Sequence, residues 1–228
     1  MPDLTKAERL LIAAARLDAR GESEFTTEDL VVEAFKTFPN DFSLKGHPEY
    51  PDNNSILTLL MGRDARLIVS GWLEKTGAKK YRLTLKGAQD AAEKAPDIAD
   101  PTAHTGGALR SERKLEEALA RLFQSEAFET FREGNPEEIT FHQFCRFVGL
   151  AAPDTWQKIQ GKLESVRHLV EHARELGESG QTLRIYFRGS TREYSPADLI
   201  LLKSILDTLT RRFSPEMEEW GRKFRSSS

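Results

Sequence analysis

The sequence predicts a mainly α-helical protein made of two modules. Apolar residues recur at intervals of three and four along most of the chain, as they do on the buried stripe of amphipathic helices. Residues 73–85 instead alternate around a Gly-Ala-Lys-Lys turn, which is typical of a β-hairpin. Between residues 96 and 108, two prolines and a Gly-Gly pair interrupt every pattern, so we place a linker there.

The chain begins with two helices whose starts are marked by capping residues. Thr5 precedes the first helix, with Glu8 three positions later as a capping box. Thr26 or Thr27 can cap the second helix. The insertion that follows, residues 41–52, is longer than an ordinary turn between helices, and we expect its aromatic residues to hold it against the core.

A third helix is expected from Asn53 to about Ile68, with its apolar residues on one face. The opposite face is small and polar, because Asn54, Thr58 and Gly62 follow one another at intervals of four. Short side chains of this kind let a helix approach a DNA groove closely enough to touch base edges.

The hairpin after this helix has a basic tip. Seven positive residues between positions 63 and 86 face two acids, Asp64 and Glu74, so we expect a net basic patch in a protein whose formal charge is -3. The positive residues are Arg63, Arg66, Lys75, Lys79, Lys80, Arg82 and Lys86. Such a patch could lie along a phosphate backbone.

The run from Gly71 to Gly87 with the Ala-rich helix after it resembles the wing and following helix of prokaryotic winged helix-turn-helix domains. The resemblance covers about the first two fifths of the chain and implies three helices plus a two-stranded wing. It also implies binding to double-stranded DNA. With the charge pattern, it points to contacts through Asn53, Asn54, Ser55, Thr58, Arg63, Arg66, Lys75, Lys79, Lys80 and Arg82.

We therefore expect a winged-helix domain over residues 1–95 and a helical second domain over residues 109–228. In the second domain the apolar spacing predicts one helix over residues 111–132, and a single short strand is expected at residues 182–188. Asp154 is expected to cap a long helix. The apolar faces exceed the needs of so small a core, which favours a homodimer or a protein partner.

Composition excludes several classes of protein. Of the 228 residues, 39% are hydrophobic and 30% are charged, which is normal for a globular chain with a real core. A single cysteine, Cys145, allows no disulfide framework and favours a reducing compartment. We see neither a signal peptide nor an apolar run long enough for a membrane, so we expect a cytoplasmic protein with no membrane partner.

The sequence gives little support to an enzyme, a metal site or a cofactor. His168 and His172 have the spacing of two helical metal ligands, but no third histidine or cysteine is placed near them. Cys145 with His142 could be drawn as a nucleophile and base, although a small buried packing residue is the commoner role of a free cysteine. Carboxylates alternate with cations as on a solvated helix face, and there is no Gly-rich phosphate loop.

Two functions remain open at this point. The first is a DNA-binding transcriptional regulator that uses a winged helix for duplex contact and residues 109–228 for dimerisation or partner binding. The alternative is a non-enzymatic accessory DNA-binding or docking subunit of a larger prokaryotic complex, such as a defence or mobile-element system.

Overall fold

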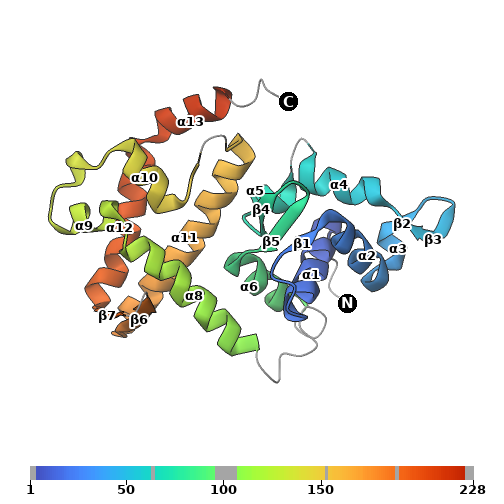
Figure 1. Cartoon of the computed structure of the whole chain (residues 1–228), viewed down its shortest axis with the longest axis horizontal. Helices are drawn as coiled ribbons and strands as arrows, with labels where there is room; N and C mark the ends of the chain where they lie inside the picture. The colour runs from blue at the N-terminus through green and yellow to red at the C-terminus, as the bar shows by residue number, and fades with distance from the viewer. Residues whose placement is uncertain (1–3, 63–64, 96–106, 152–153, 188–189, 224–228) are drawn as a thin grey trace. The chain divides into compact units, whose positions relative to one another are not determined.

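The computed structural model describes residues 4–62, 65–95, 107–151, 154–187 and 190–223, and most of them are helical (Figure 1). The expected mainly α class is therefore confirmed. The chain divides into two compact units, Met1–Arg110 and Ser111–Ser228. Most of the expected linker, residues 96–108, lies outside the described residues.

Two capped helices, α1 (Lys6–Ala19) and α2 (Thr27–Thr37), begin the first unit. The Thr5 hydroxyl accepts the Glu8 N–H at 3.3 Å while the Glu8 carboxylate accepts the Thr5 N–H at 2.8 Å. Thr26 closes a second capping box, so both expected helix starts are confirmed. The largest fully buried aliphatic side chains of this unit are Leu10, Leu11, Ile12, Leu30, Ile56 and Leu60.

A three-stranded antiparallel sheet packs on these helices. Its order is β1 (Phe25–Thr26), β5 (Lys80–Leu83) and β4 (Leu73–Gly77), so the expected hairpin is present and gains a strand from the segment before α2. Phe25 pairs with Tyr81, and both side chains are buried. The hairpin is therefore fastened to the core along one edge.

Helix α6 (Leu85–Lys94) follows the hairpin, and Thr84 caps it. Gly87 lies so close to the Trp72 backbone that a Cβ atom at this position would be 2.3 Å from the Trp72 carbonyl oxygen. The Trp72 indole N–H donates to the Asp90 carboxylate at 2.5 Å. Helix α6 thus packs closely against the base of the hairpin and holds it in place.

The insertion contains a short helix and a second small hairpin, α3 (Pro39–Phe42), β2 (Ser43–Leu44) and β3 (His47–Pro51). Phe42 is fully buried and holds the insertion against the core, as expected. The expectation is wrong for Tyr50, which is 58% exposed because it lies on the solvent-facing hairpin.

The single helix expected from Asn53 to about Ile68 is wrong. Helix α4 (Asn53–Met61) stops at Gly62, whose backbone is extended, and α5 (Arg66–Val69) starts after Ala65 in the left-handed region at φ 37°. Glycine is a poor helix former, and a Cβ atom at Gly62 would lie 2.3 Å from the Thr58 carbonyl oxygen, so this end of α4 favours glycine. The apolar periodicity continued through the break because both helices face the same core.

The second unit begins within α8 (Gly107–Phe123), and α9 (Glu126–Arg132) follows, in place of the one helix expected over residues 111–132. Ser125 makes the break, because its hydroxyl accepts the Phe128 N–H at 3.1 Å and caps α9. A 3-10 turn and a further helix follow, η1 (Pro136–Glu138) and α10 (Phe141–Val148).

The long helix α11 (Trp156–Glu178) packs against α12 (Pro196–Arg212), and α13 (Ser214–Lys223) packs on both. Between α11 and α12 lie two antiparallel strands, β6 (Leu183–Phe187) and β7 (Ser190–Tyr194). The strand expected at residues 182–188 is therefore present as β6, but the expectation that the second domain has only one strand is wrong.

Two aromatic rings hold the end of the second strand. Tyr194 at the end of β7 stacks on Phe123 of α8, with the ring centroids 3.8 Å apart, and Tyr194 is buried.

The cap of α11 differs from the expected one, since Thr155 occupies the N-cap position. Asp154 instead accepts the Ala151 N–H and pairs with Lys162, both at 2.8 Å.

Candidate nucleic-acid interface

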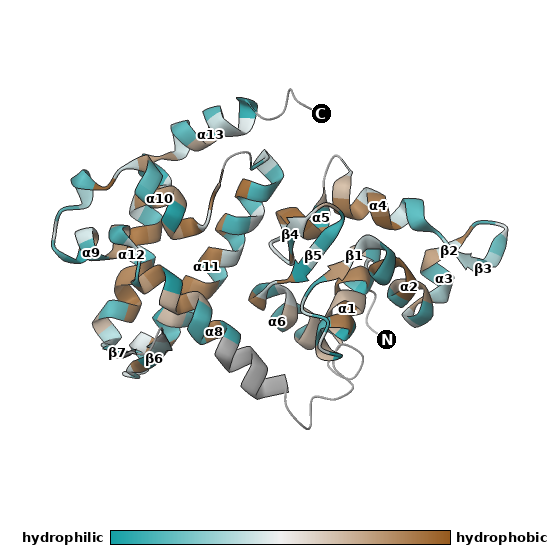
Figure 2. Cartoon of the chain, viewed as in Figure 1, coloured by the Kyte–Doolittle hydropathy of each residue, from teal (hydrophilic) through white to brown (hydrophobic). Residues whose placement is uncertain are grey.

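The polar face expected on the third helix is present on α4. Asn53, Asn54 and Thr58 are exposed, whereas Ile56 and Leu60 on the opposite side are buried. Figure 2 also shows that α4 is hydrophilic at its start and hydrophobic towards its end. This face has the small polar side chains that a base-reading helix needs.

Local hydrogen bonds shape the first turn of α4. The Asp52 carboxylate accepts the Ser55 N–H at 3.1 Å, so this acid caps the helix. The Ser55 side chain is half exposed. The Thr58 hydroxyl donates to the Asn54 backbone carbonyl at 2.9 Å, which leaves its oxygen able to accept a bond. The exposed amides of Asn53 and Asn54 are therefore the most accessible hydrogen-bonding groups on this face.

The tip of the β4–β5 hairpin carries Lys79 and Lys80, both exposed. Lys79 has φ 54°, a left-handed conformation that side chains other than glycine and asparagine seldom adopt. Its backbone carbonyl accepts the Thr27 N–H at 3.0 Å, which fastens the tip to the first residue of α2. Both lysine side chains are presented by a fixed backbone.

The basic character of the hairpin is weaker than expected. The Lys79 ammonium pairs with Glu28 at 3.0 Å, and the Arg82 guanidinium pairs with Glu24 at 3.1 Å. Lys86 is likewise paired, with Asp90 at 2.7 Å. The expectation that only two acids oppose the positive cluster is therefore wrong.

Sequence reasoning missed Glu24 and Glu28 because they are 58 and 51 residues from the cations they bind. The pairing of β1 with β5 brings these two acids beside the hairpin. Strand β1 has only two residues, so its sequence shows almost no periodicity from which this pairing could be predicted. The hydrogen bond from Lys79 holds the pKa of Glu28 below its ordinary value, so this carboxylate is charged at neutral pH.

Four further cations were expected to contact DNA. Within the described part of the chain, Arg66 on α5 and Lys80 at the hairpin tip form no ion pair and are exposed. Lys75 has no ion pair there either, but it is half-buried, because it shares a strand face with buried Leu73. Arg63 lies outside the described residues.

The alternative chemistry considered for the second unit gains no support from its geometry. Glu171, beside the two helical histidines, is held by Arg174 and Lys203, with Lys203 at 3.0 Å. The described residues contain no cluster of three or more potential metal ligands, and none of their helices combines the length and apolar character that a bilayer span requires.

Cys145 is buried, and its burial raises the pKa of the thiol to about 11, with a further contribution from the charge of Asp154. A thiol with this pKa is almost wholly protonated at neutral pH and is a poor nucleophile. His142, its suggested base, is exposed on α10.

Comparison with known proteins adds no further identification: no family model, curated protein or solved structure matches this chain.

Proposed function

We propose that this protein binds double-stranded DNA through a winged helix in its first unit. In this proposal the polar face of α4 enters the major groove, and the tip of the β4–β5 hairpin lies along the phosphate backbone. The observation that carries the proposal is that one compact unit presents both features: exposed Asn53 and Asn54 on α4, and exposed, unpaired Lys80 on a hairpin fixed to α2. Among the described residues, no acidic side chain forms an ion pair with Lys80.

The ion pairs of the hairpin do not prevent such contact. Lys79 and Glu28 are 66% and 63% exposed, and pairs in this setting contribute little to stability. A phosphate can therefore replace Glu28 as the partner of Lys79 without a large cost to folding. Because the formal charge of the whole chain is -3, the attraction has to be local and should weaken strongly as salt rises.

Duplex titrations at several salt concentrations test the proposal. Lys80→Gln should lower the slope of log K against log[salt] by about 0.9, the loss of one phosphate contact, on every duplex alike. Asn54→Ala should weaken a preferred site by about 1–3 kcal/mol while non-specific affinity stays nearly the same. Lys45→Gln is the matched control, because it removes one exposed cation outside both the candidate interface and the groove described below.

A double variant decides the outcome. Lys79→Ala with Lys80→Ala should lower the salt slope by roughly two units. Unchanged duplex affinity in this variant, with circular dichroism showing a folded protein, would remove the DNA-binding proposal and leave the first unit as a protein-docking module.

The docking alternative has its own supporting observation in the second unit. Tyr186 on β6 is 72% exposed, and Ile200 on α12 is 39% exposed, so apolar side chains are open to a partner. If this unit dimerises the chain, light scattering should give twice the monomer mass of 25.8 kDa, and Tyr186→Ser should shift the population towards monomer. A monomer at high concentration would leave a different protein as the partner.

A further inference from the structure

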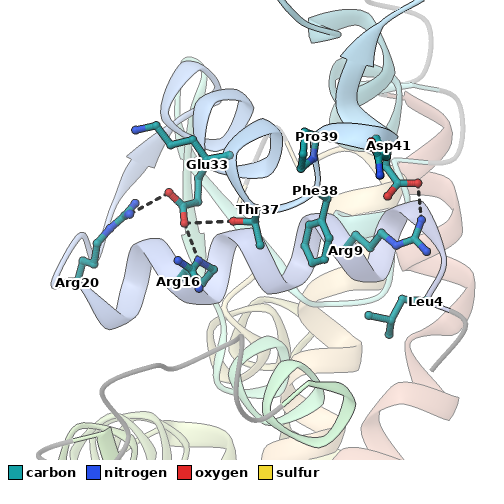
Figure 3. A pocket seen from close by; sticks show the side chains of 11 residues that line it. Leu4, Arg9, Arg16, Arg20, Glu33, Thr37, Phe38, Pro39 and Asp41 are labelled. Carbon is teal, nitrogen blue, oxygen red and sulfur yellow. Dashed lines mark hydrogen bonds and ion pairs between the residues drawn. The ribbon is translucent and has the colours of Figure 1, made fainter. Parts of the chain in front are cut away.

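A groove of about 580 Å³ runs along α1 in the first unit, beside the end of α2 and the start of α3 (Figure 3). It contains none of the residues of the candidate nucleic-acid interface. Figure 3 shows an ion-pair group at either end, Arg16, Arg20, Glu33 and Thr37 at one and Arg9 with Asp41 at the other, with Phe38 between them.

The groove is positively charged although the protein is acidic. Its lining has four cationic side chains, Arg9, Arg16, Arg20 and Lys36, against two carboxylates. A concave surface whose charge is opposite to that of the whole chain concentrates ions of the other sign. This pattern favours an anionic ligand.

One of the two carboxylates, that of Glu33, binds an arginine with each of its oxygens. Glu33 is buried, and its oxygens accept Arg16 Nε at 2.7 Å and Arg20 at 2.9 Å. Burial by itself would raise the pKa of Glu33, but the bonds from both arginines outweigh it and lower the pKa below its ordinary value. A charged Glu33 therefore orients two guanidinium groups along the wall of the groove.

Donor capacity is left over after these pairs form. The Arg20 guanidinium has five N–H donors, more than it uses in its pairs with Glu33 at 2.9 Å and Glu22 at 3.7 Å. At the other end, Arg9 binds Asp41 in the same way. Lys36, on the last turn of α2, is exposed and forms no ion pair with the described residues.

We propose that this groove binds a small organic anion, one that joins a carboxylate or phosphate group to an apolar body. The charged group would be held by Lys36 and the arginines through charge-assisted hydrogen bonds. Leu4, Phe38 and Pro39 provide apolar surface for the remainder of the ligand. The volume lies within the usual range of small-molecule sites.

Titration of the full chain with three probes, followed by amide chemical shifts, tests the proposal. The probes are inorganic phosphate, phenyl phosphate and benzoate. We expect saturable shifts at groove residues with phenyl phosphate or benzoate, and weaker binding of inorganic phosphate, which lacks an apolar body. The tighter of the two aromatic probes identifies the preferred charged group.

Variants of opposite sign make the test specific. Lys36→Gln should weaken binding about tenfold, the usual loss of one hydrogen bond to a charged group. Asp41→Asn should strengthen binding several-fold, because it removes a competing carboxylate and frees Arg9. Lys45→Gln is the matched control and should leave binding unchanged, since Lys45 is also exposed but lies outside both the groove and the candidate nucleic-acid interface.

Three results would overturn the proposal. One is the absence of saturable binding by any probe at millimolar concentration. Another is equal binding by wild type, Lys36→Gln and Asp41→Asn. The third is a response of groove residues to duplex DNA alone, which would make the groove part of a nucleic-acid surface. Because the readout uses small anions, its failure is separable from failure of duplex binding.

Discussion

Replacing Gly87 with alanine should destabilise the first unit, although alanine is the better helix former. Gly87 is in the first turn of α6, where an added Cβ would lie 2.3 Å from the Trp72 carbonyl oxygen and 2.9 Å from Leu83 Cδ1. The Trp72 oxygen cannot easily withdraw, because it accepts the Thr84 N–H at 3.0 Å and the Thr84 hydroxyl at 3.1 Å.

The size of the effect follows from two opposing contributions. Overpacking a well-filled site usually costs about 1–3 kcal/mol, and a clash with backbone belongs near the upper end. The greater helix propensity of alanine returns about 1 kcal/mol. The net loss should be about 2 kcal/mol, which lowers the melting temperature of a unit of this size by roughly 10 °C.

Thermal unfolding followed by circular dichroism measures this loss. Gly77→Ala is the control, because a Cβ there meets Lys80 at an ordinary 3.7 Å, and it should change stability by less than about 0.5 kcal/mol. A melting temperature for Gly87→Ala equal to or above that of wild type would refute the close packing of α6 on Trp72.

Three further predictions rest on buried or paired groups. Glu33→Gln should destabilise the first unit by about 1–3 kcal/mol. Since folding lowers the pKa of Glu33, denaturation from pH 7 downward should show this difference complete above the ordinary value of 4.5 and shrinking below it. Glu28→Gln should raise the affinity for every duplex several-fold, because phosphate no longer has to displace a carboxylate from Lys79; an unchanged affinity would remove Lys79 from the interface. Cys145, with a thiol pKa of about 11, should react with alkylating reagents only slowly in the folded protein and rapidly in denaturant, and stoichiometric native labelling within minutes would contradict its burial.

Features encoded within a few residues could be predicted from the sequence. Thr5 with Glu8 marks one helix start and Thr26 marks another, because the capping bonds join residues three apart. The exposed face of α4 followed equally from local spacing. Features that depend on distant partners could not be predicted in this way.

Strand β7 and the acids beside the hairpin illustrate that limit. Tyr194 at the end of β7 stacks on Phe123, 71 positions earlier in the chain, and no local pattern contains that contact. Glu28 neutralises Lys79 through a similarly distant pairing. The end of α4 is a different case. Gly62 is a residue that often ends a helix, but apolar residues continue at helical spacing beyond it, and this spacing led to the prediction of one longer helix.

Helix α2 is held at both ends by features with separate roles. Its first residue, Thr27, donates to the hairpin tip at Lys79, while Glu33 and Lys36 in its later turns line the groove. An α-helix with an unbroken hydrogen-bond ladder moves as a rod, and the eleven residues of α2 span about 16 Å. Helix α2 thus connects the hairpin tip to the groove as one rigid element. A displacement of either end of the helix therefore moves the other end as well, without any change in the residues between.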